Sequence, residues 1–289
     1  MPTMGVIGCT VLSNELTYLV ARDPDVHTVV VVDNDEGRKL LIKLRRARAC
    51  ESLEPIMVDR LGSRWYDDDE LLIWVNPSDM HNSQERMRNT MTAEIMLMSE
   101  SVDCILLLYG QCRCQTLDIA ALEEETEVPI LYLVDHNNVV VDDCISAIMG
   151  SSERYLRTMM EFKGAFFITP GYVDGYTPKM ESDDLVGLMD EIERMTIAFE
   201  AMGNPSLIKL DNQIEGGKEY HDMIDMFART FGLEVHTIPC DLSVFDDSYD
   251  WAKNVMRART RGKEPVVIVS NEMAAIPPPP YRMWEELDR

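Results

Sequence analysis

Short apolar runs rich in β-branched residues recur along the whole chain, and they constrain its fold more than any other feature. Most are continuously apolar, as strands covered on both faces of a parallel sheet must be. We predict strands at residues 4–9, 27–33, 71–76, 104–110, 129–135, 165–170, 206–211, 234–239 and 265–270. Segments with helical periodicity separate them, at 12–22, 36–49, 82–100, 115–125, 139–162, 184–203, 217–231 and 246–260. This alternation predicts an α/β protein with mostly parallel sheets, helices on both faces and right-handed crossovers.

A polar stretch containing Gly and Pro, residues 172–184, separates two sets of these predicted elements. We therefore expect two Rossmann-like lobes, a larger one over residues 1–175 and a smaller one over residues 176–276. Residues 277–289 begin with four prolines, which favour polyproline II, and form an expected Pro-rich tail. We expect this tail to dock through Tyr281 and Trp284, on its own chain or on a neighbour.

The chain is strongly acidic, with 51 Asp and Glu residues against 27 Lys and Arg residues and a net charge of −24. Such a charge repels nucleic acid and anionic membranes. The basic run at residues 39–48 is interpreted as a cationic face of one helix. No stretch reaches the roughly 18 apolar residues of a membrane span, and no signal peptide is evident. We expect a cytoplasmic protein, of an oligomeric state that the sequence leaves open.

The seven cysteines are an odd number scattered through the chain. This pattern favours reduced thiols, metal ligands or buried packing over a disulfide framework. Cys50 and Cys104 fall in the interior of a predicted helix or strand, so we expect them to pack as small apolar residues.

Several of the remaining distinctive residues lie at or just after the carboxyl ends of predicted strands, where open parallel sheets bind their ligands. They are Cys9, Tyr109, Gly110, Cys112, Asp135, His136, Thr169, Pro170, Gly171, Asp211, Asn212, Cys240 and Asp241. If the strands are neighbours, Cys9 and Cys112 face one crevice. Cys144 follows Asp143 near a predicted helix start, which lowers a thiol pKa. Cys9, Cys112 and Cys144 would form a three-thiolate set with one open position, for Zn²⁺ or an iron–sulfur cluster.

The chain lacks the usual nucleotide and hydrolase motifs. It has no GxGxxG, no GxxxxGK[ST] and no GxSxG sequence. Glu15 lies in the first turns after Cys9, where a carboxylate can act as an acid, a base or a ligand. The GSSERY segment at residues 150–155 either binds an anion through a helix N-terminus or, more simply, contains a helix N-cap at Ser151 or Ser152.

Four segments, VIGCTVLSNEL, DCILLLYGQC, DDCISAIMGSSERY and GAFFITPGYVDGY, resemble the family catalogued as domain of unknown function 1638. Its pattern is a Cys-Gly start with a later Glu, a Tyr-Gly-x-Cys-Gly turn, an Asp-Cys-Ile segment leading to Gly-Ser-x-x-Arg-Tyr, and a Thr-x-Gly-Trp-like segment. The matching positions are Cys9, Glu15, Tyr109, Gly110, Cys112, Asp143, Cys144, Gly150, Ser151, Arg154, Tyr155, Thr169 and Gly171.

Three positions depart from that pattern. Thr10 and Arg113 replace the glycines after two of the cysteines, and Tyr172 stands where a Trp is expected. The first two changes place bulk beside the proposed thiols. The resemblance implies an origin in methanogens and other anaerobes, where such proteins are encoded among corrinoid-dependent methyl-transfer genes. It therefore implies a corrinoid or methyltransferase protein as partner, and an anaerobic cytoplasm.

These observations lead to three hypotheses. In the first, the chain is a cytoplasmic metal-binding protein whose ligands are Cys9, Cys112 and Cys144, and it serves corrinoid-linked methyl transfer or one-carbon metabolism. The surrounding or substrate-contacting residues would be Glu15, Tyr109, Gly110, His136, Asp143, Ser151, Arg154 and Thr169. The second is a metal-free enzyme with Cys112 or Cys144 as nucleophile and His136 as base. The third is a non-catalytic partner or regulatory protein that uses its acidic surface and its tail.

Overall fold

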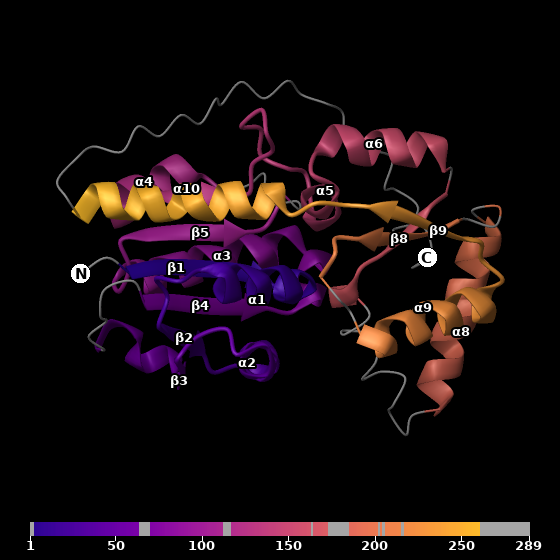
Figure 1. Ribbon diagram of the computed structural model, residues 1–289, viewed down its shortest axis with the longest axis horizontal. Coiled ribbons are helices and arrows are strands. Elements are labelled where there is room, and N and C mark those ends of the chain that lie inside the picture. The colour runs from indigo at the N-terminus through magenta and orange to yellow at the C-terminus, as the bar shows by residue number, and fades with distance from the viewer. Residues whose placement is uncertain are drawn as a thin grey trace.

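Two parallel sheets form the framework of the computed structural model, which describes residues 3–63, 70–111, 117–162, 164–172, 185–201, 203, 206–214 and 217–260. The first sheet has the strand order β3-β2-β4-β1-β5-β6, and the second has the order β7-β8-β9 (Figure 1). The strands are β1 (Thr3–Cys9), β2 (Thr28–Val32), β3 (Ser52–Ile56), β4 (Glu70–Asn76), β5 (Cys104–Leu108), β6 (Ile130–Tyr132), β7 (Phe166–Ile168), β8 (Leu207–Asp211) and β9 (Val235–Pro239). All their pairings are parallel, so the predicted α/β class is confirmed.

The helices alternate with these strands. They include α1 (Ser13–Arg22), α2 (Asp35–Ala47), α3 (Gln84–Ser99), α4 (Ile119–Thr126), α5 (Cys144–Met149), α6 (Ser152–Glu161), α8 (Leu185–Ala201), α9 (Gly217–Phe231) and α10 (Ser243–Thr260). On the first sheet, α1 packs against α2 and α10, whereas α3 packs against α4. The connections from β1 to β2 and from β4 to β5 run in opposite directions across the sheet. Because both are right-handed crossovers, they place these two groups of helices on opposite faces. No helix in the described part of the chain is long and apolar enough to cross a membrane.

Two local features differ from the sequence-based prediction. The strand β3 was not predicted, because it is short, largely polar and contains Pro55. A proline is tolerated there because β3 is an edge strand. The helix predicted at 139–162 is two helices, α5 and α6, and Gly150 between them adopts the left-handed conformation with φ of 88°. The strand predicted at 265–270 and the tail at 277–289 lie outside the described residues.

The main core fills the space around the first sheet. Every residue of β1 and β4 is buried, as expected for strands covered on both faces. The methionines of α3 at positions 87, 91 and 98 are buried as well and belong to this core. A smaller cluster around Phe199, Leu207 and Phe227 lies on the second sheet.

The chain crosses between the sheets at positions other than the expected boundary at residue 175. The strand β7 precedes that boundary but pairs with β8 of the second sheet. The helix α10 follows it but packs on the first sheet, where Phe245 and Tyr249 are fully buried. The long α10 lies across the first sheet after the chain leaves β9 (Figure 1).

Candidate functional site

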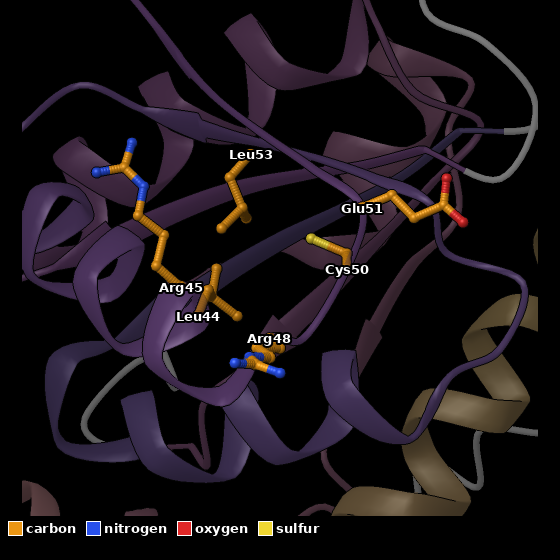
Figure 2. Close-up of a pocket in the computed structure, with 6 residues that line it drawn as sticks. All are labelled: Leu44, Arg45, Arg48, Cys50, Glu51 and Leu53. Atoms are coloured by element: carbon orange, nitrogen blue, oxygen red, sulfur yellow. The ribbon is translucent and has the colours of Figure 1, made fainter.

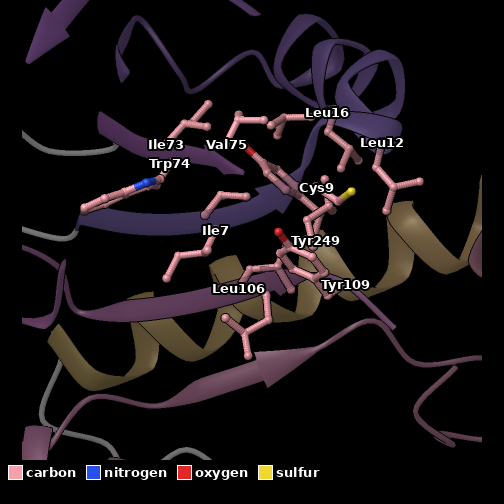
Figure 3. Packing of buried hydrophobic residues seen from close by; sticks show 14 of the residues in the cluster. Ile7, Cys9, Leu12, Leu16, Ile73, Trp74, Val75, Leu106, Tyr109 and Tyr249 are labelled. Atoms are coloured by element: carbon pink, nitrogen blue, oxygen red, sulfur yellow. The ribbon is translucent and has the colours of Figure 1, made fainter. Parts of the chain in front are cut away.

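The carboxyl ends of three neighbouring strands bring together the first part of the site. Cys9 is the last residue of β1 and pairs with Asn76, the last residue of β4. On the other side, Gly8 pairs with Leu108 of β5, so Tyr109 follows directly beside Cys9. Cys9 and Tyr109 are both 1% exposed and belong to the main core cluster, part of which is drawn in Figure 3.

Cys144 reaches the same edge of the sheet from the start of α5. It is 7% exposed, and Asp143 before it caps the helix by accepting a hydrogen bond of 2.7 Å from the Ser146 N–H. The turn after β5 packs tightly against this cap, because a Cβ atom on Gly110 would lie 2.5 Å from the Asp143 nitrogen. Only glycine fits such an approach. The neighbouring Gln111 N–H donates to the Val141 carbonyl at 2.7 Å.

The Tyr109 side chain is buried beside these groups. Burial is the largest cause that raises its pKa well above the ordinary value. The electrostatic contributions of Cys9, Glu94 and Cys144 raise this pKa further. A hydrogen bond from Asn76 acts in the opposite direction. Two thiols that are distant in the sequence therefore lie close to one buried phenol.

Glu94 is a member of this cluster that the sequence reasoning missed. Its side chain is buried, and it accepts a hydrogen bond of 2.6 Å from the Asn76 Nδ2 atom. Burial raises the pKa of the Glu94 carboxyl to about 7, although the bond from Asn76 opposes this shift. A signal was present in the sequence, because Glu94 interrupts the apolar stripe of α3 formed by Met87, Met91 and Met98.

The turns that follow the strands of the second sheet contact the same region. A Cβ atom on Gly171, after β7, would lie 1.8 Å from the Val11 carbonyl oxygen, so the two backbones touch. Thr169 is fully buried, and its hydroxyl accepts a hydrogen bond of 3.1 Å from the Tyr172 N–H. The carboxyl ends of both sheets therefore approach each other.

A buried hydrogen bond also joins the two sheets. Glu15 of α1 is 1% exposed and accepts a hydrogen bond of 2.6 Å from Asn212, which follows β8. The sequence predicted Glu15 in the first turns after Cys9 and Asn212 at the end of a strand, but it gave no sign of their direct contact, because 197 positions separate them.

Ser151 and Arg154 have structural contacts at the start of α6. The Ser151 hydroxyl caps the helix by accepting from the Arg154 N–H at 3.2 Å, as the simpler interpretation of this serine expects. The Arg154 guanidinium donates to the carbonyls of Met149 and Pro239 and so holds α5 against the end of β9. Next to it, burial raises the pKa of the Cys240 thiol to about 11, and Arg154 partly offsets this shift.

His136 does not join the described cluster. The His136 side chain is exposed on the turn around residues 134–140, and its ring contacts Asn137. Cys112 lies outside the described residues. Within the part that the structure describes, no group of three or more His, Cys, Asp or Glu side chains is arranged to hold a metal ion.

Cys104 and Cys50 have the environments expected of packing residues. Cys104 is fully buried in β5, and burial raises the pKa of its thiol to about 12. Cys50 is partly buried beside β3, and burial raises its thiol pKa as well.

Comparison with known proteins gives one match. No curated protein and no solved structure matches the chain. The family described as "Protein of unknown function (DUF1638)" matches residues 75–249, which is more than half of the chain. The matched region contains Tyr109, Cys112 and Cys144, whereas Cys9 precedes it. The chain therefore belongs to this family.

Proposed function

We propose that the chain is a metal-binding protein in which Cys9, Cys112 and Cys144 hold a zinc ion or an iron–sulfur cluster. One observation carries this proposal: Cys9 lies beside Tyr109 at the carboxyl edge of the first sheet, and the turn at Gly110 packs against Asp143, the residue before Cys144. Cys112 follows Tyr109 by three residues in the sequence. Ligands of open parallel sheets bind at this edge.

The chemistry of the donor set fits such a group. Three thiolates are soft ligands that suit zinc or iron. Buried thiolates need a cation beside them, because isolated buried charges are costly. Tyr109 and Asn76 would supply polar groups around the sulfur atoms, which is the usual way that proteins tune a metal site.

The bound group would supply either an open coordination position that activates a thiol or methyl acceptor, in the case of zinc, or electron transfer, in the case of a cluster. The link to corrinoid-dependent methyl transfer or one-carbon metabolism, with a corrinoid or methyltransferase protein as partner in an anaerobic cytoplasm, belongs to the same proposal. It rests on the family resemblance alone.

Metal analysis of protein purified without oxygen tests the site. We expect about one zinc or about four irons per chain, and an absorbance band in the visible range if a cluster is bound. Replacing any of Cys9, Cys112 or Cys144 by Ser should remove most of the metal. Cys240→Ser is the matched control, because this buried cysteine also follows a strand but lies outside the set. Less than about 0.2 equivalents of metal per chain in the wild-type protein would contradict the proposal.

If the protein is instead a metal-free enzyme with a cysteine nucleophile, the structure favours Glu94 over His136 as its base. A cysteine nucleophile needs a base, and exposed His136 makes no described hydrogen bond to the cluster. Glu94, with a pKa of about 7 beside Tyr109, is better suited to accept a proton. The pH profile of thiol alkylation separates the two functions. A Cys144 thiol with a pKa near about 8.5, the unperturbed value, would contradict its role as an activated nucleophile.

A further inference from the structure

The C-terminal half of α2 carries a cluster of cations in an otherwise acidic chain. Three arginines at this end make no described ion pair or side-chain hydrogen bond: Arg45 and Arg46 in α2, and its C-cap Arg48. By contrast, Arg38 at the start of the same helix binds two carboxylates. Positive charges are favourable at the C-terminal end of a helix dipole, which explains why they gather there. They are therefore available to a ligand.

These cations point to two different sides of the helix. Arg45 and Arg48 line a small pocket of about 330 Å³ that also contains Cys50 (Figure 2). Lys43 and Arg46 line a separate groove of about 950 Å³. Lys43 and Arg46 share a face because they lie three residues apart on the helix, whereas Arg48 follows the helix as its left-handed C-cap.

The larger groove lies between the helices of the first sheet and the turns of the second. Its residues are Asn14, Thr17, Tyr18, Ala21, Lys43, Arg46, Ala47, Asn212, Gln213, Ile214, Asp241, Leu242 and Asp246. Most of these side chains are polar or charged, and Ala21, Ala47, Ile214 and Leu242 add apolar surface. Its size and its position between two structural units are typical of small-molecule sites.

The two cations differ in how they are held. The Lys43 Nζ atom donates to the Ser13 hydroxyl at 2.6 Å and to the Asn14 side-chain oxygen at 2.7 Å, so it is fixed at the edge of the groove. The Arg46 side chain is exposed, and its guanidinium can adapt to a ligand. A fixed ammonium beside an adaptable guanidinium suits an anion with several oxygen atoms.

The carboxylates on the opposite wall already have partners. Asp246 binds Arg22 at 2.7 Å and accepts from the Tyr18 hydroxyl at 3.2 Å. Asp241 accepts from Ser243, which lowers the pKa of its carboxyl. Because Asp241 stays ionised, this wall favours a hydroxyl or amine donor on the ligand.

We propose that this groove binds a small organic anion, whose phosphate or carboxylate group contacts Lys43 and Arg46 while a donor group faces Asp241. This site is separate from the thiol cluster and does not depend on the presence of a metal.

Calorimetric titration with pyrophosphate and with citrate, at constant ionic strength, tests the assignment. At least one probe should bind with saturation, and the probe that binds better identifies phosphate or carboxylate as the recognised group. Arg46→Met and Lys43→Met should each weaken binding about tenfold or more. Arg45→Met is the matched control, because it removes an equally exposed arginine from the other side of α2.

Two results would overturn the proposal. One is the failure of both probes to saturate the wild-type protein below about 1 mM. The other is an equal loss of binding in Arg45→Met, which indicates attraction to net charge and not to the groove. Circular dichroism confirms that each variant is folded, and metal content measured on the same samples separates this result from that of the thiol site.

Discussion

Replacing Glu94 by Gln should remove a pH-dependent destabilisation from the core. Gln keeps the acceptor for the Asn76 amide but cannot ionise. In the wild-type protein, burial raises the pKa of Glu94 from 4.5 to about 7, so the folded state holds this proton more tightly than the unfolded chain does. The contribution of Glu94 to stability is therefore complete below pH 4.5, and it is lost as the pH rises through about 7.

The shift corresponds to about 3 kcal/mol in total, because each pKa unit is worth about 1.4 kcal/mol. Between pH 5 and pH 8, the free energy of unfolding of the wild-type protein should fall by about 2–3 kcal/mol relative to that of the variant. Urea unfolding of both proteins at several pH values, at matched metal content, measures this difference directly. Glu100→Gln is the control, since Glu100 is an exposed residue at the end of the same helix.

A constant stability difference between wild type and Glu94→Gln across this pH range would refute the reasoning. It would mean that Glu94 ionises in the folded state as readily as in the unfolded chain. A pH dependence of the same size in Glu100→Gln would show that general charge repulsion, and not burial, is the cause.

Three further substitutions test the packing that supports the site. Lys253→Met leaves the buried carboxylate of Asp23, now bound at 2.6 Å, without its cation, and should cost about 3–5 kcal/mol in urea unfolding. Gly171→Ala places a methyl group 1.8 Å from the Val11 carbonyl, so it should separate the two turns and lower the melting temperature and the metal content together. Gly150→Ala forces alanine into φ of 88°, where its methyl group makes only an ordinary contact with Asp241 at 3.8 Å, and should cost only about 1–2 kcal/mol with no change in metal content.

The order of helices and strands could be predicted from the sequence, because most strands are continuously apolar and most helices show a clear helical periodicity of their apolar residues. Strand ends also placed Cys9 and Tyr109 at one edge, since parallel neighbours end together. The hydrogen-bond partners of buried polar residues could not be predicted from the sequence. The bond between Asn76 and Glu94 depends on which helix covers which strand, and an isolated polar residue in an apolar stripe does not reveal that.

The position of α10 leads to a last prediction about the expected larger lobe. A fragment of residues 1–175 contains every strand of the first sheet but lacks α10, which contributes Val244, Phe245, Tyr249, Ala252, Val255 and Met256 to its core. At about 1.5–3 kcal/mol for each large side chain, these residues supply about 10 kcal/mol. That is comparable with the whole stability of a typical domain.

The fragment alone should therefore lack a cooperative unfolding transition and bind hydrophobic dyes. Adding α10 as a peptide of residues 241–261 should restore cooperativity, because the ion pair of Lys253 with Asp23 and the packing of Tyr249 re-form. A scrambled peptide of the same composition is the control. A fragment that unfolds cooperatively without the peptide would show that the first sheet folds independently of α10, and that the division of the chain near residue 175 describes its folding units.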